Sequence, residues 1–128
     1  MKALSGHELW QRVRGLEGRT IYTIDKHRAN IVSQVTSSEV RLLESDGERR
    51  PSTPLRTDIM NTYAYLLGNG QVTGEDFARI PGNLVGRRVS RIVLAILPDA
   101  VPEQIEKFHR KPPSVPRCGI RLRGDQDC

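Results

Sequence analysis

The stretch from residue 72 to residue 97 constrains the fold more than any other part of this 128-residue chain. Apolar side chains recur there at intervals of three and four, on both sides of a Pro-Gly-Asn break at residues 81–83. That spacing is typical of amphipathic helices, and Pro-Gly-Asn is typical of a turn between them. We therefore expect a short helix capped by Thr73 and Asp76, a tight turn, and a longer helix that Pro98 ends.

The chain before this stretch predicts one helix followed by a sheet. Ser5 and Glu8 have the spacing of a capping box, and Leu9, Val13 and Leu16 then recur on one helical face. Three segments rich in β-branched residues follow, alternate with period two and are joined by short polar connections. They occupy residues 19–25, 30–36 and 39–44, and an antiparallel meander is the simplest arrangement for them.

Alternation with period two also assigns side chains to the faces of these strands. Ile31, Ser33 and Val35 are expected on one face of the second strand, and Val40 and Leu42 on one face of the third. Because one apolar face of such a sheet would otherwise be exposed, we expect the sheet to pack against helices.

A further helix is predicted from Thr53-Pro54 to Gly68 or Gly70, and it completes a tri-helical unit. We predict an α+β fold with an N-terminal helix, a three-stranded antiparallel sheet and a tri-helical unit of helix-turn-helix or winged-helix type. The domain is expected to span residues 1–108, with an extra helical turn at residues 103–109. Residues 109–128 are rich in Pro, Gly and charge, and we predict a flexible basic tail there.

The charge balance favours an anionic partner. Lys and Arg number 20 against 15 Asp and Glu, which gives a net charge of +5, and such an excess attracts phosphate-rich molecules. No apolar run reaches the ~20 residues that span a membrane, and no signal-peptide core is present, so we expect a cytoplasmic protein without membrane contact. Cys118 and Cys128 have no further Cys or His at ligand spacing, so we expect no metal site.

The long helix begins with a cluster of arginines. Arg87 and Arg91 are four residues apart and therefore neighbours on a helix surface, with Arg88 and Ser90 close by. Cations at a helix N-terminus oppose the macrodipole, which indicates a requirement for positive charge. We expect Arg87, Arg88, Ser90 and Arg91 in or near a DNA major groove, and Asn83 on a phosphate. The alternative is a solvated basic face that only keeps the protein soluble.

The sheet carries a second basic set: Arg19, Lys26, His27, Arg28, Arg41, Arg49 and Arg50. Lys26 and Arg28 are at a hairpin tip, and Arg49 and Arg50 are at the end of the meander, so we expect all four on the DNA backbone. Tyr22 could stack on a base or close the core, and we favour the core. The tail adds cations that would strengthen binding without selecting a sequence: Arg110, Lys111, Arg117, Arg121 and Arg123.

The residues form no recognisable catalytic centre. The carboxylates and lysines lack the spacing of a metal-dependent nuclease, and no Gly-rich phosphate loop or nucleophile elbow is present. We therefore predict a non-enzymatic protein without a cofactor. Two alternatives stay open. One is a protein-interaction domain that pairs an exposed face of its Val/Ile/Leu-rich helix with another chain, as a homodimer or a larger assembly. The weaker one is a small ribonuclease that uses Lys26 or His27.

Residues 18–101 carry a recurring order of elements: strands in G-R-T-I-Y-T-I-D and A-N-I-V-S-Q-V-T-S-S-E-V-R-L-L, a helix, G-x-V-T, a helix, and an apolar helix ending in L-P. This order resembles a small module that has a meander followed by helices. The module occurs alone or fused to nuclease domains in bacterial restriction-type proteins. The resemblance implies duplex-DNA recognition without cleavage, in a restriction, defence or regulatory system. Such modules place small or Ser residues before the last helix, where this chain has Gly86-Arg87-Arg88.

Overall fold

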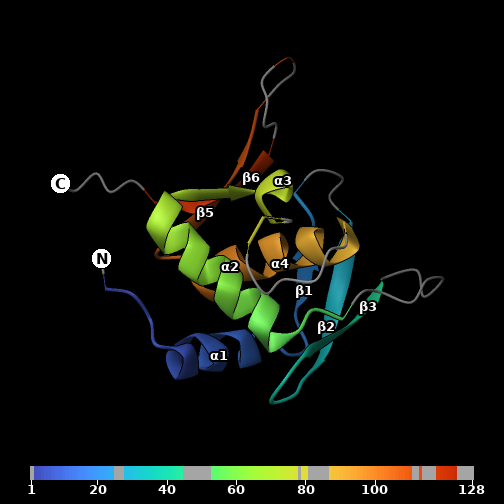
Figure 1. The fold of residues 1–128 in the computed structure, drawn as a ribbon. Helices are drawn as coiled ribbons and strands as arrows, with labels where there is room; N and C mark the ends of the chain where they lie inside the picture. The colour runs from blue at the N-terminus through green and yellow to red at the C-terminus, as the bar shows by residue number, and fades with distance from the viewer. Residues whose placement is uncertain are drawn as a thin grey trace.

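The computed structural model describes residues 2–24, 28–44, 53–77, 79–80, 87–110, 113 and 118–123. Over these residues the protein has a mixed α+β fold of several helices and two three-stranded antiparallel sheets (Figure 1). The elements in chain order are α1 (Gly6–Arg14), β1 (Thr20–Tyr22), β2 (Ala29–Val35), β3 (Val40–Glu44), α2 (Arg56–Asn69), β4 (Gln71–Thr73), α3 (Gly74–Phe77), α4 (Arg87–Ala100), β5 (Ile105–His109) and β6 (Cys118–Leu122).

The first sheet is the meander expected from the sequence, with strand order β1-β2-β3. Its register changes at a β-bulge between Val32 and Gln34. A bulge moves the following side chains to the opposite face, so Ile31 and Ser33 are exposed whereas Val35 is buried. The expected common face for these three residues is therefore wrong.

The second sheet has strand order β4-β6-β5, and it was not predicted. The central strand β6 pairs with β4 on one side and with β5 on the other. The predicted flexible tail is thus wrong for Cys118–Leu122, and the predicted helical turn at residues 103–109 is wrong because β5 occupies most of that segment. The tail contains few apolar residues, but Ile120 is completely buried, and its burial against the core fixes the strand.

The local sequence determines where α1 and α3 begin. Ser5 Oγ accepts a hydrogen bond from the Glu8 N–H, at 3.1 Å, while the Glu8 carboxylate accepts one from the Ser5 N–H, at 2.9 Å. Thr73 and Asp76 repeat this reciprocal arrangement at α3. Both predicted capping boxes are confirmed, because each depends only on side chains three residues apart.

The helix α2 begins later than the expected Thr53-Pro54 cap. Its N-cap is Leu55, whose N–H donates to the carboxylate of Asp58 at 3.2 Å. The predicted cap at Thr53 is therefore wrong, and the hydrogen bond at the start of α2 comes from the buried Asp58, in its first turn. The helix ends as expected, at Gly70, which has a φ of +86°, a left-handed conformation that glycine adopts without a steric cost.

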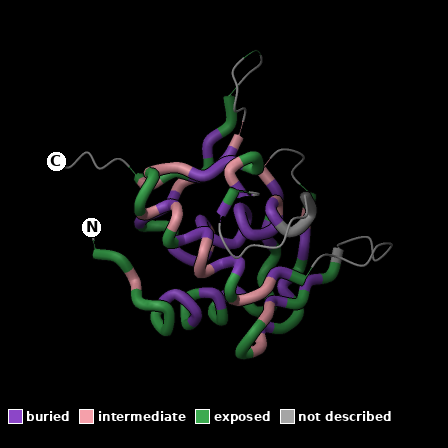
Figure 2. Tube along the Cα trace, viewed as in Figure 1, coloured by how far each residue is buried: buried purple, intermediate pink, exposed green. Residues whose placement is uncertain are grey.

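The helix α4 lies at the centre of the fold and is surrounded by other elements. Figure 1 shows it behind α2, with α1 below, the first sheet to the right and the second sheet above. It contacts α1, α2, α3, β1, β5 and β6. Every residue from Ile92 to Pro98 is buried, and Figure 2 shows this helix largely in the colour of buried residues. The helix also continues through Pro98 to Ala100, so the predicted end at Pro98 is wrong.

The hydrophobic core packs around α4. The predicted inward faces of α1 and β3 are confirmed, since Leu9, Val13, Leu16, Val40 and Leu42 are all buried. Phe77 and Ile80, at and after α3, are buried as well. These side chains cover α4 from several directions, which explains why it keeps no polar face over residues 92–98.

Candidate nucleic-acid interface

The residues that we expected to contact DNA at the start of α4 differ in their burial and in whether the structure describes them. Arg87 and Arg88 form its first turn, but their side chains lie outside the described part of the structure. Ser90 is buried, so its expected contact with DNA is wrong. Arg91 is half-buried and already has a partner within the protein. Asn83 lies outside the described residues.

The burial of α4 limits which of its residues could reach a groove. A recognition helix presents one exposed face to base edges, whereas α4 has no exposed residue from position 92 to position 98. Over the same residues α4 offers no exposed apolar face to another chain.

Of the four basic residues expected on the DNA backbone, the structure describes only Arg28, which is exposed. Lys26, Arg49 and Arg50 lie outside the described residues, as does His27. Tyr22 is 46% exposed, so the interpretation of this residue as part of the core is wrong.

Residues 105–123 carry the net charge of the molecule. They hold six of the 20 Lys and Arg residues and one of the 15 Asp and Glu residues. This segment alone therefore has a net charge of +5, equal to that of the whole chain, and the remainder is balanced. The structure describes four of these cations, and they lie in or directly after β5 and β6, the strands at the top of Figure 1: Lys107, Arg110, Arg121 and Arg123.

Cations stack on Phe108 on one face of the hairpin. The guanidinium carbons of Arg110 and Arg121 lie 4.9 and 5.6 Å from the centre of its ring, within the range of a cation–π interaction. Arg121 also donates to Glu106 at 2.6 Å, and Arg123 donates to the other carboxylate oxygen at 3.3 Å. One carboxylate thus balances a group of three guanidinium ions, and these contacts hold the arginines in defined positions.

Lys107 connects the hairpin to the first sheet. Its Nζ donates to the backbone oxygen of Tyr22 at 3.4 Å. Arg28 lies beside this contact, because its carbonyl oxygen accepts from the N–H of Thr23 at 3.0 Å. Lys107, Tyr22 and Arg28 are all exposed, and these backbone contacts bring their residues close together where β5 approaches the end of β1.

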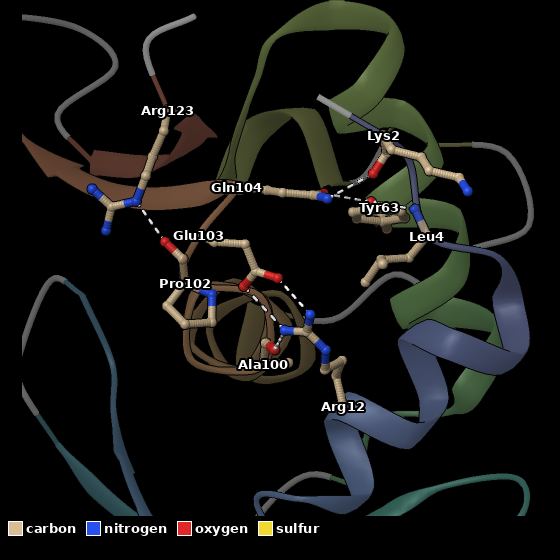
Figure 3. Close-up of polar contacts among 9 residues, drawn as sticks. All are labelled: Lys2, Leu4, Arg12, Tyr63, Ala100, Pro102, Glu103, Gln104 and Arg123. Carbon is tan, nitrogen blue, oxygen red and sulfur yellow. Dashed lines mark hydrogen bonds and ion pairs between the residues drawn. The ribbon is translucent and has the colours of Figure 1, made fainter.

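An ion pair fastens the turn that leads into the hairpin. Arg12 of α1 donates two hydrogen bonds to the Glu103 carboxylate, at 3.0 and 2.5 Å, and a third to the carbonyl of Ala100 at 3.3 Å (Figure 3). These hydrogen bonds lower the pKa of Glu103 and raise the pKa of Arg12. The turn between α4 and β5 is therefore tied to the N-terminal helix.

Gln104 joins the same turn to distant parts of the chain, as Figure 3 shows. Its side-chain oxygen accepts from the Tyr63 hydroxyl at 2.7 Å, and its amide donates to the carbonyl of Lys2 at 2.8 Å. Tyr63 in turn accepts from the N–H of Leu4 at 3.0 Å. The Gln104 carbonyl accepts from the N–H of Arg123 at 2.7 Å. The base of the hairpin is thus anchored to the body by buried and backbone hydrogen bonds, which favours a rigid attachment.

The Pro, Gly and charge content of residues 109–128 predicts a tail and does not reveal the hairpin. Arg110, Arg121 and Arg123 were recognised as cations, but they were placed in a tail. A count of charge by segment, rather than over the whole chain, separates residues 105–123 from the balanced remainder. That pattern was available from the sequence alone.

No protein-family model matches this chain, and no curated protein or solved structure matches it. Among the residues that the structure describes, no group of three or more His, Cys, Asp and Glu side chains could hold a metal ion. In the same part of the chain, no helix is both long enough and apolar enough to cross a membrane. The function is therefore inferred from the geometry and charge of the hairpin.

Proposed function

We propose that this protein is a non-catalytic nucleic-acid-binding module that holds duplex DNA with its β5–β6 hairpin. The observation that carries the proposal is the location of the entire net charge of +5 in residues 105–123. Duplex DNA carries one phosphate charge per ~1.7 Å of its axis, so a compact group of Lys and Arg releases several counterions at once. That release is the main source of affinity for the phosphate backbone.

Within the α+β class, we propose that residues 56–122 form a winged helix. The order α2, β4, α3, α4, β5, β6 supports it, as does the position of β6 between β4 and β5. A winged helix likewise has a helix, a strand, two further helices and a closing hairpin, whose strands complete the sheet. In this comparison the β5–β6 hairpin is the wing, and α4 takes the place of the recognition helix.

The mode of contact differs from that of a groove-reading helix. Because α1 and β1 pack against α4, only its first turn, with Arg87 and Arg88, is proposed to approach DNA. The hairpin and the adjoining Arg28 then contact phosphates. Contacts of this kind set affinity and orientation but carry little sequence information, so we propose binding with weak sequence preference, as one part of a larger restriction, defence or regulatory assembly.

A charge-matched pair of double variants tests the proposal. Lys107→Ala with Arg110→Ala removes two exposed cations from the hairpin. We expect weaker binding of a labelled duplex by fluorescence anisotropy. We also expect the slope of log K against log salt to become shallower by about 0.9 for each lost phosphate contact.

The control is Arg14→Ala with Arg19→Ala. Both arginines are exposed, and neither makes an ion pair within the described part of the chain. Arg14 belongs to α1, on the opposite side of the body from the hairpin (Figure 1). The control removes the same number of charges as the hairpin variant. Because its arginines do not belong to the proposed interface, we expect it to change the salt slope little. Equal effects of the two double variants, or a wild-type protein that does not bind duplex DNA, would contradict the proposal.

A further inference from the structure

The outer face of the first sheet carries a row of exposed apolar side chains. Tyr22 is 46% exposed, Ile31 37% and Leu43 55%. Ile31 lies directly opposite Leu43 across β2 and β3, while Tyr22 lies opposite Ala29, two residues before Ile31. The row therefore crosses all three strands, from the edge next to the hairpin to the far edge.

The register of β2 places Asn30 and Val32 on the inner face of the sheet and Ile31 on the outer face. Asn30 is 4% exposed, whereas its neighbour Ile31 faces outward. The buried Asn30 amide donates to the carbonyl of Arg28 at 3.3 Å. A slip of one residue would exchange the two faces. Because Val32 is completely buried on the inner face, the same register that buries Asn30 leaves Ile31 exposed on the outer face.

Cations flank the row at both ends. At the β1 end, Lys107 donates to the backbone of Tyr22, and Arg28 is adjacent. At the β3 end, Arg41 lies on the same face as Leu43 and is held by hydrogen bonds to Glu39 and Gln34, at 2.8 and 3.1 Å. Because Arg41 is paired with Glu39, the positive charge beside this apolar and aromatic surface comes from Lys107 and Arg28 at the β1 end.

We propose that this face binds the unpaired nucleotides of a single strand. Unpaired nucleotides expose both the flat faces of their bases and their phosphates, whereas a duplex exposes phosphates and hides the base faces. Tyr22 stacks on one base, Ile31 and Leu43 contact the neighbouring nucleotide, and Lys107 and Arg28 neutralise phosphates. The proposal rests on the proposed function, because it extends the phosphate-binding surface of the hairpin onto the adjoining sheet.

The test compares Tyr22→Ala with Tyr22→Phe, which keeps the ring. A labelled oligothymidylate and a labelled duplex are titrated by fluorescence anisotropy. We expect Tyr22→Ala to bind the single strand about 5- to 150-fold more weakly, the range of one lost stacking contact, and to bind the duplex as the wild type does. Tyr22→Phe is expected to bind the single strand nearly as well as the wild type.

A second variant, Leu43→Ala, changes the opposite end of the row and is expected to weaken single-strand binding by a smaller factor. Thermal unfolding of each variant shows whether it is folded. Unchanged single-strand affinity in folded Tyr22→Ala and Leu43→Ala overturns the inference. So does an equal loss in Tyr22→Phe, because that loss would not come from stacking.

The wild-type protein separates this inference from the proposed function. Binding of duplex but not of the single strand overturns the inference alone, and binding of neither overturns both. Self-association that Leu43→Ala abolishes, without any single-strand binding by the wild type, would assign the face to a second copy of the chain and also overturn the inference.

Discussion

At Gly119 the backbone of β4 comes so close to β6 that a side chain does not fit. An ideal Cβ on this residue would lie 2.4 Å from the carbonyl oxygen of Val72 and 3.1 Å from the ring of Phe108. The first of these neighbours belongs to the paired strand, and the second carries the stacked guanidinium groups of Arg110 and Arg121. Neither can move without disturbing the hairpin, so this position requires glycine.

We expect Gly119→Ala to lower the free energy of unfolding by about 1–3 kcal/mol, the usual cost of overpacking. Gly68→Ala is the matched control, since Gly68 lies within α2 and no atom is within 4 Å of its ideal Cβ. It should raise stability by roughly 0.5–1 kcal/mol because alanine favours the helix. Urea unfolding measures both changes, and equal stability of the two variants would refute the steric argument.

The ion pair between Arg12 and Glu103 predicts a dependence of stability on pH. Hydrogen bonding by Arg12 lowers the pKa of Glu103 in the folded protein. A carboxyl with a depressed folded pKa stabilises the fold above its unfolded pKa, and this contribution is lost as pH falls through the folded value. We therefore expect Glu103→Gln to lower the urea midpoint at neutral pH, and the difference from wild type to shrink on acidification below 4.5, the ordinary pKa of a glutamate carboxyl.

Glu75→Gln is the control for that titration. Glu75 is exposed and makes no ion pair within the part of the chain that the structure describes. Its replacement should change the midpoint little at any pH. A difference between wild type and Glu103→Gln that stays constant on acidification would mean that the pair does not titrate as proposed.

At the scale of elements, β6 decides whether the second sheet exists. It lies between β4 and β5, and those two strands do not pair with each other. Its residue Ile120 is completely buried. Arg123, which follows the strand, donates its backbone N–H to the carbonyl of Gln104 and its Nε–H to the carbonyl of Pro102, at the base of the hairpin. A segment that looks like a tail by composition is therefore an integral part of the core.

Truncation tests whether β6 is an integral strand of the core or part of a dispensable tail. Removing residues 111–128 deletes β6, and we expect loss of cooperative thermal unfolding because β4, β5 and one side of α4 lose their partner. Removing only residues 124–128 leaves every described contact in place, so its melting temperature should stay close to that of the full chain. A stable, cooperatively folded protein without residues 111–128 would show that β6 is not required for the fold.

At the scale of the whole molecule, charge and burial together place the interface. The central helix α4 is covered by α1 and β1 as well as by the second sheet, so the arginines that begin it cannot be followed by an exposed groove-reading face. The net charge of the chain falls in residues 105–123 instead, and Lys107 of β5 donates to the backbone of Tyr22 in β1. The two proposed surfaces are therefore adjacent and form one basic region.

The sequence by itself determined the elements that depend on neighbouring residues. The capping boxes of Ser5 with Glu8 and of Thr73 with Asp76, the meander and the end of α2 at Gly70 all follow from contacts within a few residues. Only the tertiary structure decided that α4 is buried on all sides over residues 92–98 and that β6 is a central strand. Both depend on which distant segments cover an apolar side chain. The spacing of residues along the chain does not show which of these segments pack together.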